Sequence, residues 1–150
     1  MPGRMSHTQV IGIGNGWRRD DGVGPAVAAL LAGRPKLRTA VLPGEGTELI
    51  AAWTGCERVV VVDAMRSGAA AGTIRHFDAV AAPLPVGAFP RLSHAFGLAE
   101  AIEMARILGR LPRRLEIYGI EAADLGDGAG LSAEVERAAH QVAAAIMSSE

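Results

Sequence analysis

The chain has 150 residues and a formal net charge of −1, and 49% of its residues are hydrophobic. At this length we expect a single domain with a sizeable core. The near-zero charge gives no sign of a nucleic-acid-binding face, and the single cysteine, Cys56, excludes a small domain held by disulfides. Without an apolar stretch of the roughly 20 residues that cross a membrane, or a signal-like apolar core, we expect a cytoplasmic protein that does not insert into membranes.

The first part of the chain is typical of a strand, a loop and a helix. Residues 9–14 have strand-forming character, and we expect residues 1–8 before them to be disordered. Gly14-Asn15-Gly16 allows a tight turn, and the acidic pair Asp20-Asp21 precedes a predicted helix over 21–32. Loops of this kind lie at the carboxyl end of a strand, where open α/β sheets bind their ligands.

The middle of the chain predicts the centre of a sheet. A short strand over 39–42 is followed by a helix over 48–53, for which Thr47 is the expected N-cap. Val59-Val60-Val61-Val62 has no polar alternation, which indicates a strand buried on both faces, and we expect it to end at Asp63.

The remaining elements complete an alternating pattern. A strand over 73–77, expected at an antiparallel edge, precedes an irregular loop over 79–92 that carries three prolines and is long enough to suggest a functional or mobile segment. The loop is followed by a helix from Ser93-His94 to about Leu108 and by a strand over 114–120. An acidic glycine-rich loop then leads to a last helix, for which Ser132 is the expected N-cap. This order predicts a three-layer αβα fold, with a mostly parallel five-stranded sheet and helices on both faces.

Three polar residues stand at the ends of these elements: Asp21, Asp63 and His94. In a parallel sheet the loops of Asp21 and Asp63 share one edge, and the helix start at His94 can join them. Two carboxylates and one imidazole suit a divalent transition metal with open coordination positions. Each residue also has a purely structural interpretation, because either aspartate can cap a helix or loop and His94 can be a surface histidine.

Two other chemistries have weaker support. Gly12, Gly14 and Gly16 suggest a dinucleotide-binding loop, but the third glycine of that fingerprint falls at Trp17, and an acidic pair repels phosphate. Glu45 is the one feature that favours a ribose contact. Nucleophilic catalysis by Cys56 or Ser93 lacks a recognisable setting.

Six short segments occur in a characteristic order: Gly12-Ile-Gly-Asn15, Asp20-Asp-Gly-Val-Gly24, Val61-Val-Asp-Ala64, Ser93-His94, Tyr118-Gly-Ile-Glu121 and Leu131-Ser132. In this order and spacing they resemble the hydrogenase maturation proteases over about residues 9–146. The resemblance implies an endopeptidase that removes the C-terminal extension of a nickel–iron hydrogenase large-subunit precursor after nickel insertion. It implies nickel ligands at Asp21, Asp63 and His94. We expect Asp21 and Asp63 also to be catalytic by orienting a water molecule. Whether the metal, a carboxylate or a metal-bound water drives hydrolysis stays open at this point.

The resemblance further implies that the nickel belongs to the precursor, so the isolated protein is expected to be metal-free. A monomer is a separate expectation that does not rest on the resemblance. Three positions depart from the family pattern: Glu45 in the loop before Thr47, Glu121-Ala122 where Gln-Pro is usual, and Trp17 in place of an aliphatic residue. Two alternatives stay open at this point. One is a checkpoint module that binds the nickel-loaded subunit without cutting it, and the other is a nucleotide-binding α/β domain.

Overall fold

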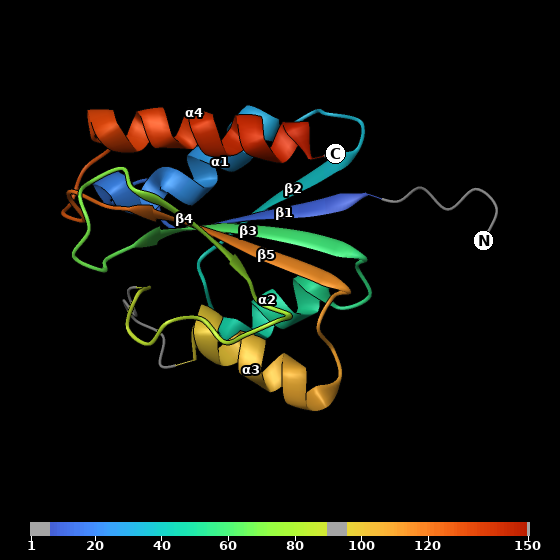
Figure 1. Cartoon of the computed structure of the whole chain (residues 1–150). Helices are drawn as coiled ribbons and strands as arrows, with labels where there is room; N and C mark the ends of the chain where they lie inside the picture. The colour runs from blue at the N-terminus through green and yellow to red at the C-terminus, as the bar shows by residue number, and fades with distance from the viewer. Residues whose placement is uncertain (1–6, 90–95, 150) are drawn as a thin grey trace.

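The computed structural model describes residues 7–89 and 96–149 (Figure 1). Its strands are β1 Thr8–Ile13, β2 Leu37–Leu42, β3 Arg58–Met65, β4 Ile74–Asp78 and β5 Arg114–Glu121. Its helices are the 3₁₀ turn η1 Arg19–Gly22, α1 Val23–Leu31, α2 Gly46–Trp53, α3 Leu98–Leu108 and α4 Ala133–Ser148. Thr8, which we expected in a disordered stretch, instead begins β1. No helix in the described ranges is long and apolar enough to cross a membrane.

The five strands form one sheet in the order β2-β1-β3-β5-β4. All neighbours are parallel except β4, which runs antiparallel to β5 at the edge. The predicted fold class and the antiparallel edge strand are therefore confirmed. From β1 the chain moves outward to β2 and then returns past β1 to β3, so the strand order reverses between β1 and β3. Such a reversal is where open α/β sheets form a ligand-binding crevice.

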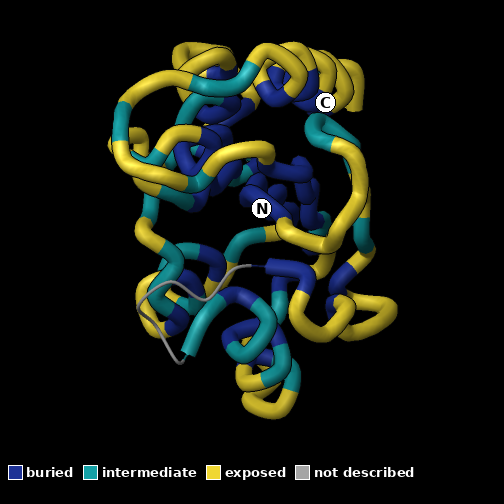
Figure 2. The backbone as a smooth tube through the Cα atoms, turned by 90° about the vertical axis from the view of Figure 1, so that its left-hand side faces the viewer, coloured by how far each residue is buried: buried dark blue, intermediate teal, exposed yellow. Residues whose placement is uncertain are grey.

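Helices cover both faces of this sheet (Figure 1). On one face α1 and α4 pack on Val10, Val60 and Val62, and on the other α2 and α3 pack on Ile11, Val59 and Val61. Because successive strand residues point to opposite faces, the unbroken valine run supplies both layers of core. The buried strands lie inside, and exposed segments form the outer surface (Figure 2).

Two glycines let α1 approach the sheet closely. A Cβ on Gly12 of β1 would overlap the carbonyl group of Gly24, and a Cβ on Gly24 would overlap the carbonyl oxygens of Ile13 and Val62. The beginning of α1 is therefore in contact with the backbones of both β1 and β3. This packing fixes where the loop before α1 lies relative to β3.

Several predicted element boundaries are wrong, and three of them have a clear physical reason. Helix α2 begins at Gly46, because the side chain of Glu45, and not Thr47, caps it by accepting hydrogen bonds from the amides of Thr47 and Glu48 at 3.1 Å each. Helix α3 begins at Leu98, after an extended Gly97 whose amide donates to Glu100 at 3.0 Å. Strand β3 continues past Asp63 to Met65, because its pairing with β5 extends to Glu121.

The close approach of α1 predicts an unusual response to a glycine substitution. Alanine normally stabilises a helix over glycine by about 1 kcal/mol, but Gly24→Ala is expected to destabilise the protein by about 1–3 kcal/mol because of the overlap. Gly16→Ala is the matched control, since a Cβ there meets nothing within 4 Å. Chemical denaturation of both variants measures the effect. A Gly24→Ala protein as stable as the wild type would contradict the packing described.

Candidate functional site

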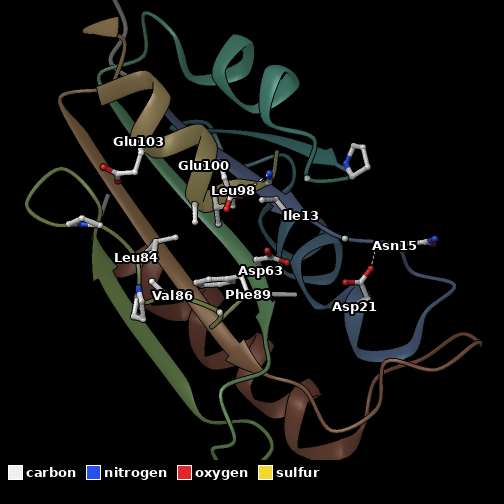
Figure 3. A pocket seen from close by; sticks show the side chains of 18 of the residues that line it. Ile13, Asn15, Asp21, Asp63, Leu84, Val86, Phe89, Leu98, Glu100 and Glu103 are labelled. Atoms are coloured by element: carbon white, nitrogen blue, oxygen red, sulfur yellow. Dashed lines mark hydrogen bonds between the residues drawn. The ribbon is translucent and has the colours of Figure 1, made fainter. Parts of the chain in front are cut away.

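A cavity of about 490 Å³ opens at the carboxyl ends of β1 and β3 (Figure 3). The loop after β1, residues 43–44 after β2, the segment 83–89 and the beginning of α3 line it. Its size lies in the range of small-molecule and side-chain binding pockets. Asp21 and Asp63 both line this cavity, as the position of their loops predicts.

Asp63 lies near the centre of the cavity in Figure 3. It alternates with Val61 and Met65 along β3, so it points to the face covered by α2 and α3. The pairing of β1 with β3 stops at Gly12 and Val62, and the next residue, Asp63, is free of that neighbour. Only 6% of Asp63 is exposed, and one carboxylate oxygen accepts the amide of Ala64 at 2.8 Å. Burial, together with the negative charge of Asp21, raises the pKa of Asp63 well above its usual value.

Asp21 reaches the same cavity from the turn η1. Its carboxylate accepts the backbone amide of Asn15 at 2.9 Å, which closes the glycine-rich loop on itself. A Cβ at Gly14, where φ is 146°, would overlap the carbonyl oxygen of Asp21, so this closure depends on glycine. Burial raises the pKa of Asp21, although the bond from Asn15 and the charge of Arg18 oppose that change.

The neighbouring Asp20 points away from the cavity, into the loop between β5 and α4. Its carboxylate accepts the amides of Ala123, Asp124 and Ser132 at 2.7–2.9 Å and the hydroxyl of Ser132 at 2.8 Å. Burial by itself would raise the pKa of Asp20, but these four hydrogen bonds outweigh it and lower the pKa. Asp20 is therefore a structural anchor. Ser132 stands at the predicted N-cap of α4, but its hydroxyl binds Asp20.

The two carboxylates in the cavity suit cation binding or proton transfer. No side chain caps η1 or α1, so Asp21 does not cap a helix. Its carboxylate accepts the amide of Asn15, and that of Asp63 accepts the amide of Ala64. Within residues 7–89 and 96–149, no three His, Cys, Asp or Glu side chains come close enough to hold a metal ion. The third predicted ligand, His94, lies outside the described residues.

The nucleotide-binding interpretation finds no support in this loop. The amide of Asn15, which a phosphate would need, already donates to Asp21. Glu45, the proposed ribose contact, is occupied in capping α2. The geometry therefore disfavours an anion at the beginning of α1.

Glu121, one of the departures from the family pattern, lies outside the cavity lining. It is 3% exposed and accepts the amide and hydroxyl of Ser67 at 2.6–3.1 Å. Its carboxylate holds the turn after β3 and does not line the cavity.

Arg18 lines the cavity and donates to the carbonyl of Leu125 at 3.3 Å. Its place beside the acidic pair allows two predictions from the sequence, a solvated side chain or one that orients the substrate or its C-terminal carboxylate. Glu100 and Glu103 of α3 also line the cavity and were not predicted. The apolar lining residues Leu84, Val86 and Phe89 belong to the proline-containing loop that its length marked as functional. The sequence offered no signal for the two glutamates, which read as ordinary helix-surface residues.

Comparison with known proteins assigns this arrangement to a family. A sequence profile described as hydrogenase maturation protease matches residues 43–149. The hydrogenase expression/formation protein HupM of Azotobacter chroococcum is 30% identical over 97% of this chain and 72% of its own length. The chain belongs to the hydrogenase maturation protease family. The predicted family and its endopeptidase activity in processing the C-terminus of the nickel–iron large subunit are confirmed.

Solved structures of similar fold include members of this family. The hydrogenase maturating endopeptidase HybD from E. coli superposes with a TM-score of 0.74 at 22% identity, covering 95% of this chain and 93% of that one. HybD from Thermococcus kodakarensis gives a TM-score of 0.69 at 21% identity, covering 95% and 97%. The HoxM protein of Cupriavidus necator is 29% identical, and the match spans 86% of this chain but 66% of HoxM.

The contrast between the three aspartates predicts stability changes of opposite sign. Asp20→Asn removes charge-assisted hydrogen bonds and is expected to destabilise the protein by about 1.5–3 kcal/mol at neutral pH. Asp63→Asn removes a buried charge that Asp21 repels, and it is expected to stabilise the protein by about 1 kcal/mol. Thermal and denaturant unfolding of both variants measure these changes.

The pH dependence of each change follows from the sign of its pKa shift. Asp63 has a raised pKa, so the wild type loses stability as pH rises above the ordinary value of 3.8 and the gain from Asp63→Asn grows toward neutral pH. Asp20 has a lowered pKa, so its contribution is present above 3.8 and is lost at lower pH. Equal destabilisation by both substitutions at every pH would contradict these assignments.

Proposed function

We propose that this protein cleaves its large-subunit precursor with Asp21 and Asp63 as the acting residues, and that both contact nickel already held by the precursor. The single observation that carries the proposal is that these two buried carboxylates, one in the turn η1 after β1 and one on the adjacent parallel strand β3, line one cavity. His94 is proposed as the third contact to the metal. The nickel in this reaction belongs to the substrate.

The chemistry of the two carboxylates supports a transient contact with a cation. Burial raises the pKa of both carboxyl groups, and the negative charge of Asp21 raises the pKa of Asp63 further. A nearby divalent cation favours the ionised form of each carboxylate and removes their repulsion. Together with the imidazole of His94, the two carboxylates leave coordination positions open and can complete a coordination sphere that the substrate mostly supplies.

Contact with the nickel-bearing subunit also positions the scissile peptide bond. With the precursor held through its metal, Asp21 and Asp63 orient a water molecule toward the carbonyl carbon. A carboxylate accepts a proton as the water attacks, the C–N bond breaks and the leaving amine gains a proton. Arg18, beside Asp21, is placed to contact a carboxylate or carbonyl oxygen of the extension.

A cleavage assay with a matched acidic control tests the proposal. Nickel-loaded precursor is incubated with the wild type, Asp21→Asn or Asp127→Asn, and its C-terminus is followed by mass spectrometry. Asp127 is an exposed acid in the loop after β5 and does not line the cavity. We expect wild type and Asp127→Asn to release the same peptide, and Asp21→Asn to be slower by at least about 100-fold, the usual contribution of general acid–base catalysis.

Three further outcomes separate the alternatives. Tight association of the wild type with a verified nickel-loaded precursor, without cleavage, would favour the checkpoint module. Equal cleavage of nickel-free and nickel-loaded precursor would contradict recognition through the metal. Full activity of Asp21→Asn would show that cleavage does not use this carboxylate.

A further inference from the structure

The segment 83–89 forms an apolar wall of the cavity, beside Glu100 and Glu103 of α3, which also line it (Figure 3). Asn15 and Asp21 lie on one side of Asp63, and Leu84, Val86 and Phe89 lie on the other. Residues 83–89 include no side chain that can donate or accept a hydrogen bond. This wall plays no part in the cleavage chemistry proposed above.

Contacts at both ends hold the segment 83–89 firmly. Leu84, Ala88 and Phe89 are 5–9% exposed and belong to the core between the sheet and the helices α2 and α3. The carbonyl of Ala88 accepts the amide of Arg66 at 2.8 Å, which ties the segment to the residue directly after β3. The wall is therefore packed against the same strand that carries Asp63.

A tight turn displays Val86 on this fixed support. The amide of Ala88 donates to the carbonyl of Pro85 at 3.4 Å, and Gly87 has a φ of 76°, as the third residue of a type II turn requires. The valine is 99% exposed, although its neighbours Leu84 and Ala88 are buried. Isolated exposed valines are common, but this one lies on the rim of a cavity whose adjoining wall is also apolar.

We propose that Val86, with Leu84 and Phe89 behind it, forms a specificity subsite for an apolar side chain of the substrate, close to the scissile bond. The proposal rests on the proposed function, because it takes the bond to lie at Asp21 and Asp63. Val86 lines the same cavity as Asp21 and Asp63, so the side chain that reaches it belongs to a residue near the bond in the precursor sequence. Covering the valine removes apolar surface from water, whereas a charged side chain would lose hydration and gain no partner from this wall.

Enzyme variants test the subsite first. Val86→Asp is expected to raise KM for the nickel-loaded precursor about tenfold, the effect of losing a small apolar contact, and to change kcat little. Val86→Ile is expected to keep the wild-type KM. Ile107→Asp is the matched control, because Ile107 is 81% exposed on α3 and does not line the cavity. Thermal melting of each variant confirms that it is folded.

Substrate variants then locate the recognised residue. Lysine is introduced into the precursor, one position at a time, at the three residues on each side of the scissile bond. At one position we expect the wild-type enzyme to lose about tenfold in kcat/KM and Val86→Asp to recover most of that loss through the new charge pair.

The outcomes distinguish the two proposals. The subsite would be overturned if Val86→Asp had the KM of the wild type. It would also be overturned if Val86→Asp cleaved none of the lysine-containing precursors with a higher kcat/KM than the wild type. Either result would leave the proposed protease function intact. Failure of the wild type to cleave verified nickel-loaded precursor would overturn the proposed function and the subsite with it.

Discussion

The buried carboxylate of Asp20 is the contact on which the geometry of the site depends. It joins the loop after β1 to residues more than 100 positions later in the chain, and its four hydrogen bonds satisfy a charge that burial would otherwise make unfavourable. Arg19, just before it, has a φ of 49°, a conformation that non-glycine residues seldom adopt and that recurs at functional sites. With Asp20 fixed on one side of the turn, Asp21 is directed to the other, toward β3.

The second constraint is the contact of α1 with two strands at once. Because Gly12 and Gly24 have no Cβ, the beginning of α1 rests on the backbones of β1 and β3 where the strand order reverses. Asp63 lies one residue beyond the last β1–β3 pair. Its position therefore follows from where β1 ends, while the longer pairing with β5 keeps its backbone rigid. The sheet holds a buried carboxylate in a place where burial opposes its charge.

Much of this arrangement is visible in the sequence. The valine run of β3 identifies the central strand, and parallel order places the loops of Asp21 and Asp63 at one edge. The division of labour between Asp20 and Asp21 is not visible, because two identical side chains one residue apart differ only in partners contributed by a distant loop. Local capping was also misjudged at Thr47, because the longer side chain of Glu45 reaches the same amides. Val86 gave no signal, since its role depends on a cavity formed by segments far apart in the chain.

The electrostatics of the cavity offer a physical reason for selectivity toward a loaded precursor. Asp21 and Asp63 repel each other, and burial opposes the ionisation of both. A neutral peptide brings nothing that offsets this repulsion, whereas a peptide attached to a bound divalent cation does, in an environment where water screens charges poorly. In the proposed reaction, binding is therefore strengthened by the event that must precede cleavage, the insertion of nickel. A metal ion bound permanently between the two carboxylates would remove the distinction between loaded and unloaded precursor, because it would neutralise their repulsion before the precursor bound.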